Sequence, residues 1–189
     1  MAVPLPSVDW SNAKTDLLTS EVIGLKLRSF IDPARILTRT IDRIAFASDA
    51  SLYRLIPRAV VQPNNTEEVR QLFRFSREYK IPLTFRSGGT SLSGQAITDG
   101  LLIDVGRFWR SANVEEEGRL LRVQPGVIGQ QANQILKKYA AKIGPDPASL
   151  SSARLGGILS NNASGMCCGV IQNAYHCRCR SSRASTRSL

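Results

Sequence analysis

The sequence predicts an α+β fold in which a mixed β-sheet is flanked by helices. Between residues 59 and 139, short apolar runs alternate with segments of helical periodicity. Two glycine-rich segments interrupt this alternation, as expected where the backbone must approach another group closely. The chain has 189 residues, 42% of them hydrophobic, a composition typical of a soluble globular domain.

The first strand is predicted over residues 59–62, a β-branched run that ends at Pro63. An amphipathic helix follows, and Asn65 or Thr66 can cap it. Its first turn is acidic and Lys80 lies near its end, where a cation is favoured. The residues expected on its apolar face are Val69, Leu72, Phe73 and Ser76.

Further strands are predicted over residues 83–86, 101–105 and 120–124. A second helix is predicted over 130–139, with its apolar face formed by Ala132, Ile135, Leu136 and Tyr139. Residues 1–35 are interpreted as an N-terminal helical extension packed on the domain, with the helical pattern Leu17, Leu18, Val22 and Leu25.

The first glycine segment, residues 86–96, holds three glycines and four small hydroxyl residues and directly follows a predicted strand. Glycines permit positive φ and close backbone approach, while the hydroxyls donate hydrogen bonds and Arg86 adds positive charge. These properties suit a pyrophosphate, although an ordinary turn between strands is the alternative. The segment matches neither the P-loop nor the G-x-G-x-x-G pattern, so a nucleotide would be held in another way.

A second glycine segment runs over residues 151–169, after the turn at 144–147. Two such segments in one domain are harder to explain as turns than one. Together with residues 46–53, 57–63 and 101–104, they give the chain a resemblance to flavoproteins of the vanillyl-alcohol oxidase and p-cresol methylhydroxylase (PCMH) type. Within that type, the chain is most similar to the FAD-linked D-lactate, glycolate and D-2-hydroxyglutarate dehydrogenases.

The resemblance implies that residues 36–176 are the N-terminal part of a PCMH-type FAD-binding domain. It implies that the first glycine segment holds the FAD pyrophosphate and that the second lies against the ribityl chain and flavin ring. For the two asparagines of the second segment, local backbone capping is the alternative. The predicted cofactor-binding residues are Arg86, Ser87, Gly88, Gly89, Thr90, Ser91, Leu92 and Gln95, then Ser152, Gly156, Gly157, Asn161 and Asn162.

By the same resemblance, the intact enzyme oxidises a small 2-hydroxy acid by hydride transfer to FAD, with the cofactor supplying the difficult chemistry. Substrate-binding basic residues and a histidine base are expected in a region C-terminal to this chain. No catalytic residue is therefore predicted here, and the electron acceptor is not identified. The alternative is a truncated, non-catalytic fragment with weak or no flavin binding.

The four cysteines fit no common zinc spacing, so no metal site is predicted. Cys167 and Cys168 are interpreted as small packing residues near the cofactor. His176 departs from the placement expected for covalent flavin attachment, and that role is rejected.

Residues 177–189 contain four arginines and no acidic residue, so they are expected to form a disordered basic tail. Their composition is that of an out-of-frame reading of a GC-rich gene. The chain carries a net charge of +10, of which this tail supplies +4. Basic residues are scattered without an aromatic platform, so nucleic-acid binding is not predicted. No membrane span or secretory signal is recognised, and a cytoplasmic location is the default.

Overall fold

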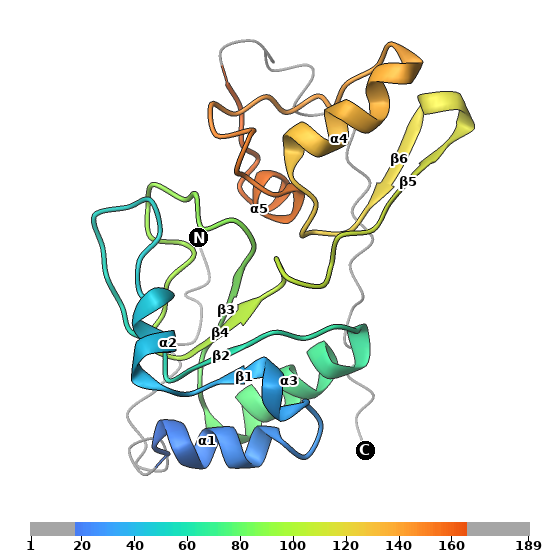
Figure 1. Ribbon diagram of the computed structural model, residues 1–189. Helices are drawn as coiled ribbons and strands as arrows, with labels where there is room; N and C mark the ends of the chain where they lie inside the picture. Colours follow the sequence, from blue (N-terminus) through green and yellow to red (C-terminus); the bar gives the residue numbers. More distant parts are fainter. Residues whose placement is uncertain (1–17, 166–189) are drawn as a thin grey trace, which may run out of the picture.

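The computed structural model describes residues 18–165, and its main body is built on a four-stranded sheet (Figure 1). The strands are β1 (Ile36–Leu37), β2 (Ala59–Val61), β3 (Leu83–Arg86) and β4 (Leu101–Asp104), in the order β1-β2-β4-β3. Strands β2 and β3 pair parallel to β4, and β1 pairs antiparallel to β2. The predicted mixed sheet is confirmed, and β1 is a short addition that the sequence did not reveal.

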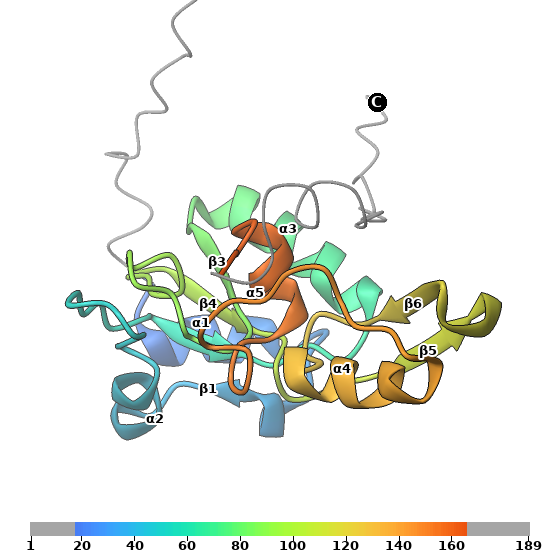
Figure 2. The same ribbon diagram turned by 90° about the horizontal axis from the view of Figure 1, so that it is seen from above.

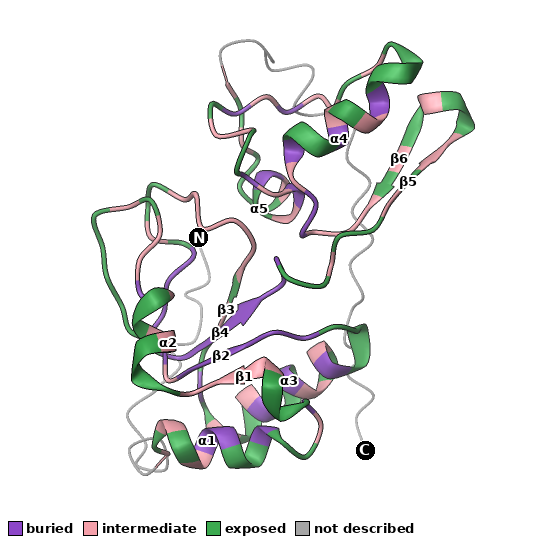
Figure 3. Ribbon diagram, in the orientation of Figure 1, coloured by how far each residue is buried: buried purple, intermediate pink, exposed green. Residues whose placement is uncertain are grey.

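Helices α1 (Ser20–Leu27) and α3 (Thr66–Tyr79) lie on one side of this sheet (Figure 1). They share one core with alternate residues of the central strands, including Ala59, Val61, Leu101 and Ile103. The intervening residues point to the opposite face, and all residues of β2 and β4 are nevertheless buried (Figure 3). Burial on both faces explains why these strands read as uninterrupted apolar runs.

Helix α3 has the predicted limits but a different buried face. Its N-cap is Asn65, whose side chain accepts a hydrogen bond from the Glu68 amide at 2.9 Å, and Lys80 ends it with a φ of +53°. Leu72 and Phe75 are buried, whereas Phe73 is 42% exposed. The buried face is rotated relative to the predicted face and includes the charged residue Glu68. Glu68 Oε2 forms an ion pair with Arg35 Nη1 at 2.6 Å.

The N-terminal helix shows the same kind of shift. Ile23 and Leu27 enter the core, whereas Leu25, expected on the apolar face, is 61% exposed. The short helix α2 (Thr40–Ala45) contacts β2 and was not predicted. A 3₁₀ turn, η1 (Pro33–Arg35), leads into β1.

A second body lies above the sheet in Figure 1. It contains the hairpin β5 (Ala112–Glu115) and β6 (Leu120–Val123), which are joined by the 3₁₀ turn η2 (Glu116–Gly118). Helix α4 (Gly129–Leu136), the 3₁₀ turn η3 (Lys137–Tyr139) and helix α5 (Leu155–Ser160) complete it. The predicted strand 120–124 therefore pairs with β5 in a separate sheet, and the second helix ends three residues before Tyr139.

This second body has its own small core, formed by Val127, Ala132, Ala153, Leu155 and Ile158. The molecule thus consists of two packed bodies, and the candidate site depends on how they meet. Within residues 18–165, no helix has the length and apolar character needed to cross a membrane, and no three potential metal-ligating side chains gather. The predictions for the four cysteines, His176 and residues 177–189 lie outside the described residues.

Candidate cofactor site

The carboxyl ends of the parallel strands β3 and β4 define the position of the site. Ser87 directly follows the end of β3, and Gly106 lies two residues after the end of β4. These two turns are in close contact, since a Cβ atom placed on Gly106 would lie 2.8 Å from the Ser87 carbonyl oxygen. Open α/β sheets bind ligands at this edge, outside the carboxyl ends of their strands.

The first glycine segment forms an irregular loop with two left-handed turns. Gly89 has a φ of +64° and Gly94 a φ of +75°. A Cβ atom on Gly89 would lie 2.5 Å from Nη2 of Arg86. Ser91 Oγ accepts hydrogen bonds from the amides of Ser93 and Gln95, both at 3.3 Å. The backbone conformation at position 89 therefore favours glycine.

Arg86 supports the loop from behind. Its Nη1 donates to the carbonyl oxygens of Phe46 at 3.3 Å, Ser48 at 2.8 Å and Ala96 at 3.5 Å. Burial lowers the pKa of this guanidinium, and the negative charges of Asp104 and Asp49 partly offset that effect. These contacts tie residues 46–48 to the glycine loop.

Asp49 also fastens the loop, and sequence reasoning did not single it out as a site residue. Its carboxylate accepts hydrogen bonds from the amides of Ser51 at 2.9 Å and Ala96 at 3.3 Å. Burial alone would raise the pKa of Asp49, but these hydrogen bonds and the charge of Arg86 outweigh it and lower the pKa. The Asp-x-Ser spacing, typical of an Asx turn, was the available signal.

The second glycine segment contains helix α5 rather than an open loop. The Gly156 amide donates to the Pro125 carbonyl at 2.9 Å, and a Cβ on Gly156 would lie 2.5 Å from Pro125 Cβ. Gly157 faces the other way, toward Ser87, with 3.1 Å between a placed Cβ and Ser87 Oγ. The structure thus gives Gly156 a packing role and places Gly157 at the junction of the two segments.

The two glycine segments meet at three points. Besides the Gly157–Ser87 approach, a Cβ on Gly88 would lie 3.0 Å from the Ser152 carbonyl oxygen. Gln95 Nε2 donates to Asn161 Oδ1 at 3.0 Å, across 66 residues of sequence. Both ribbon views place α5 close to the carboxyl ends of β3 and β4 (Figures 1 and 2).

Other predicted residues do not take part in these three contacts. The Leu92 side chain is 79% exposed, and Asn162 has a φ of +45° just beyond α5. Thr90 and Ser91 belong to the first loop, and the Ser91 hydroxyl bonds within that loop, to Ser93 and Gln95. The two segments are therefore joined through Gly88, Gly157 and the hydrogen bond from Gln95 to Asn161.

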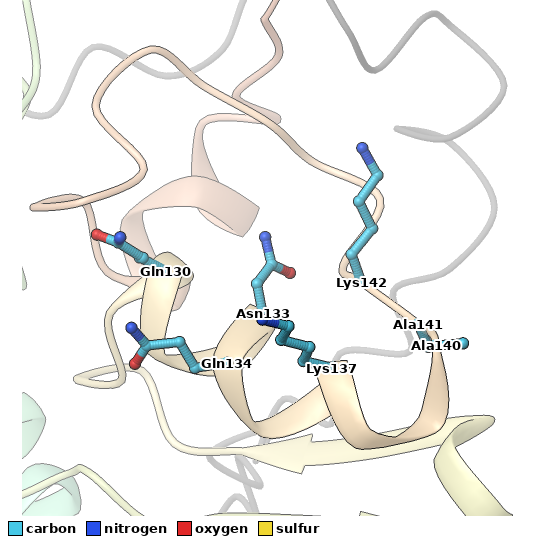
Figure 4. A pocket seen from close by; sticks show the side chains of 7 residues that line it. All are labelled: Gln130, Asn133, Gln134, Lys137, Ala140, Ala141 and Lys142. Carbon is cyan, nitrogen blue, oxygen red and sulfur yellow. The ribbon is translucent and has the colours of Figure 1, made fainter.

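A separate surface hollow of about 370 Å³ lies on helix α4 and does not include either glycine segment (Figure 4). Asn133 Oδ1 accepts the Ile143 amide there at 2.8 Å, closing the helix against the following loop. Its lining residues are Gln130, Asn133, Gln134, Lys137, Ala140, Ala141 and Lys142. None of these lining residues belongs to the predicted site.

Residues 57–181 match the family described as FAD binding domain. The chain belongs to this family. It is 35% identical over 128 residues to the D-2-hydroxyglutarate dehydrogenase of Escherichia coli K12, covering 66% of this chain and 13% of the relative. The glycolate oxidase subunit GlcD of the same strain is 31% identical over 167 residues, covering 87% of this chain and 32% of the relative. The chain thus spans only a minor part of either relative's length.

Solved structures confirm the PCMH-type fold. Alkyldihydroxyacetonephosphate synthase superposes with a TM-score of 0.65 at 24% identity, covering 75% of this chain and 29% of that one. p-Cresol methylhydroxylase superposes with a TM-score of 0.58 at 17% identity, covering 72% and 28% of the two chains. The predictions of a partial PCMH-type domain, of FAD as cofactor and of kinship with 2-hydroxy acid dehydrogenases are confirmed.

The junction of the glycine segments is chemically suited to FAD. At Gly88 and Gly157, the lack of a Cβ atom leaves no side chain where the segments approach each other. Hydroxyls and amides around them can donate to phosphate oxygens. Two further buried groups shape the junction, since Asp104 accepts from Gln62 Nε2 at 2.9 Å and from the Gly106 amide at 2.8 Å. A polar residue ending a buried strand was the sequence signal for Asp104.

Proposed function

We propose that the two glycine segments together hold FAD. The pyrophosphate would lie on residues 87–92 with Gln95, and the ribityl chain and flavin along Ser152, residues 156–157 and the Asn161–Asn162 pair. The observation that carries this proposal is the contact between the segments through Gly88, Gly157 and Gln95, within the part of the chain that matches the FAD family. Arg86 is proposed to act by holding the loop in shape.

We further propose that the whole protein oxidises a small 2-hydroxy acid of the D-lactate, glycolate or D-2-hydroxyglutarate class. The names of its relatives support this substrate class. When bound, FAD supplies the hydride acceptor. The residues described here bind and orient the cofactor, and we assign none of them as the base that removes the substrate proton. We place the protein in the cytoplasm.

Flavin titration of the purified chain tests the cofactor proposal. Gly89→Val should abolish the binding of FAD, because a branched side chain cannot occupy a φ of +64° against Arg86 without moving the loop. Gly118→Val is the matched control. Gly118 has a φ of +93° but lies in η2, far along the chain from both glycine segments. Equal loss in both variants, or full FAD binding by Gly89→Val, would contradict the proposed site.

Dye-coupled oxidation of D-lactate, glycolate and D-2-hydroxyglutarate tests the substrate proposal, with L-lactate as control. Turnover of a D-acid or glycolate but not of L-lactate supports the proposed class. The assay uses the whole protein, because this chain spans only 13% and 32% of the two relatives' lengths. Bound flavin with no turnover of any of these acids would contradict the proposed substrate class.

A further inference from the structure

We infer that Arg154 is a positioning residue that holds the second glycine segment against the first and thereby sets the geometry of the FAD cleft. The inference rests on the proposed function. Arg154 lies immediately before α5, and its Nη1 donates to the carbonyl oxygens of Gly106 and, at 3.1 Å, of Gly126. One guanidinium therefore links the turn after β4, the segment before α4 and the second glycine segment.

The backbone of Arg154 belongs to the second body. It forms an isolated β-bridge with Ile128, and the next amide, that of Leu155, donates to the Val127 carbonyl at 2.8 Å. Its side chain, in contrast, reaches the main body at Gly106. The two bodies have separate cores, and the Arg154 side chain extends from one body to the other.

The acceptor at Gly106 is itself fixed in place. The Gly106 amide donates to Asp104 Oδ1 at 2.8 Å, while Gln62 Nε2 donates to the other carboxylate oxygen at 2.9 Å. Gly106 also lies against the Ser87 carbonyl, at the entry to the first glycine segment. The acceptor, the Gly106 carbonyl, is held beside the first glycine segment, and the donor, Arg154, belongs to the second. The distance between the two segments therefore depends on Arg154.

The planar guanidinium suits this role because it presents several N–H groups in a fixed arrangement. Burial lowers the pKa of Arg154, the nearby Arg110 lowers it further, and Asp104 partly offsets both effects. Arg110 offers a natural comparison, since its Nε donates to the same Gly106 carbonyl at 2.8 Å. Arg110 lies only four residues after Gly106, in the loop between β4 and β5. Its hydrogen bond is therefore local and does not join the two glycine segments.

The test compares FAD dissociation constants for the wild-type chain and the variants Arg154→Met, Arg154→Lys and Arg110→Met. Loss of a charge-assisted hydrogen bond network should weaken FAD binding about tenfold or more in Arg154→Met. Arg154→Lys should be weakened as well, because an ammonium keeps the charge but lacks the planar fork. Arg110→Met should bind FAD within about twofold of the wild type.

Hydrogen exchange in the absence of FAD gives a second readout. The Gly126 amide donates to the Trp109 carbonyl at 2.7 Å across the same junction, so its exchange should accelerate in Arg154→Met. Exchange of the amides of β2 and β4 should remain unchanged. Equal acceleration in those strands would show general destabilisation and overturn the inference.

The outcomes also separate this inference from the proposed function. If the wild-type chain does not bind FAD, the proposed function fails. Unchanged exchange of the Gly126 amide in Arg154→Met would overturn the positioning role, whether or not FAD binds. If the wild type and Arg154→Met bind FAD equally, the inference is wrong and the proposed function stands. Wild-type affinity in Arg154→Lys would show that charge alone matters, which also contradicts positioning.

Discussion

The two glycine-rich segments have similar compositions, yet their glycines serve different physical needs. In the first, Gly89 and Gly94 adopt left-handed backbone conformations that shape an irregular loop. In the second, Gly156 and Gly157 lie inside helix α5, and none of the described glycines there has a positive φ. Their lack of a side chain allows close approach to Pro125 on one side and Ser87 on the other.

This difference shows that a glycine-rich pattern has two distinct explanations. One is a backbone conformation with positive φ, and the other is the close approach of neighbouring atoms. The distinction matters for the site, because only Gly157 of the helical pair faces the first segment. Substitutions that are alike in size should therefore have unlike consequences in the two segments, depending on whether the backbone angle or the neighbouring atoms set the limit.

The largest effect on folding is expected from Gly156→Ala. Its new Cβ would meet Pro125 Cβ at 2.5 Å and the Pro125 backbone at 3.1 Å, so helix and loop must separate. Overpacking of this kind should lower the free energy of unfolding by about 1–3 kcal/mol, measured by urea denaturation. Gly157→Ala is the control, because Ser87 Oγ can rotate away and alanine favours the helix. A larger loss at Gly157 than at Gly156 would reverse this assignment.

A smaller effect is expected from Gly89→Ala, which should lower the free energy of unfolding by about 1–2 kcal/mol through its positive φ. Asparagine tolerates that conformation better than alanine, so Gly89→Asn should cost less. At Gly156 the order should invert, with asparagine worse than alanine, because space is limiting there. The same urea denaturation measures all four variants. An identical order at both positions would mean that one explanation covers both segments.

The smallest effect concerns acid, and it should be confined to the first segment. Hydrogen bonds to its carboxylate lower the pKa of folded Asp49 below its unfolded value. Its contribution to stability is thus complete above the unfolded pKa and is lost as the pH falls through the folded pKa. The protection factor of the Ala96 amide against hydrogen exchange should fall in that acidic range, whereas that of the Gly156 amide should not. Asp49→Asn should remove this pH dependence.

The strands and the main helix were predictable because their signals are local. The continuous apolar runs at β2 and β4 were read correctly from sequence. The structure shows that Asn65, one of the two predicted candidates, is the cap of α3. The buried faces of α1 and α3 were not read correctly, because rotation of a helix is set by partners distant in sequence. Glu68 illustrates this, since only the ion pair with Arg35 makes its burial favourable.

The two glycine segments of the candidate site could be predicted from the sequence. The contacts between them, and the side chains that hold them in place, could not. The supporting contacts join residues that are far apart in sequence. The separation is 48 residues for Arg154 and Gly106, 47 for Asp49 and Ala96, and 42 for Asp104 and Gln62. Side chains of this kind have no periodicity, and their importance depends on the fold. Helix α5 was hidden for another reason, because its two glycines disfavour a helix that tertiary packing nevertheless supports.

The order β1-β2-β4-β3 also has a consequence for how the polypeptide folds during synthesis. The central strand β4 is the last of the four in sequence, and both parallel pairings require it. Until residue 104 has left the ribosome, β2 and β3 have no common neighbour, and of the four strands only β1 can pair with β2. The glycine loop after β3 is made earlier but acquires its neighbour Gly106 only then. The sheet and the turn that supports the first glycine loop therefore form together, only after β4 has been made, and the second glycine segment joins them later still.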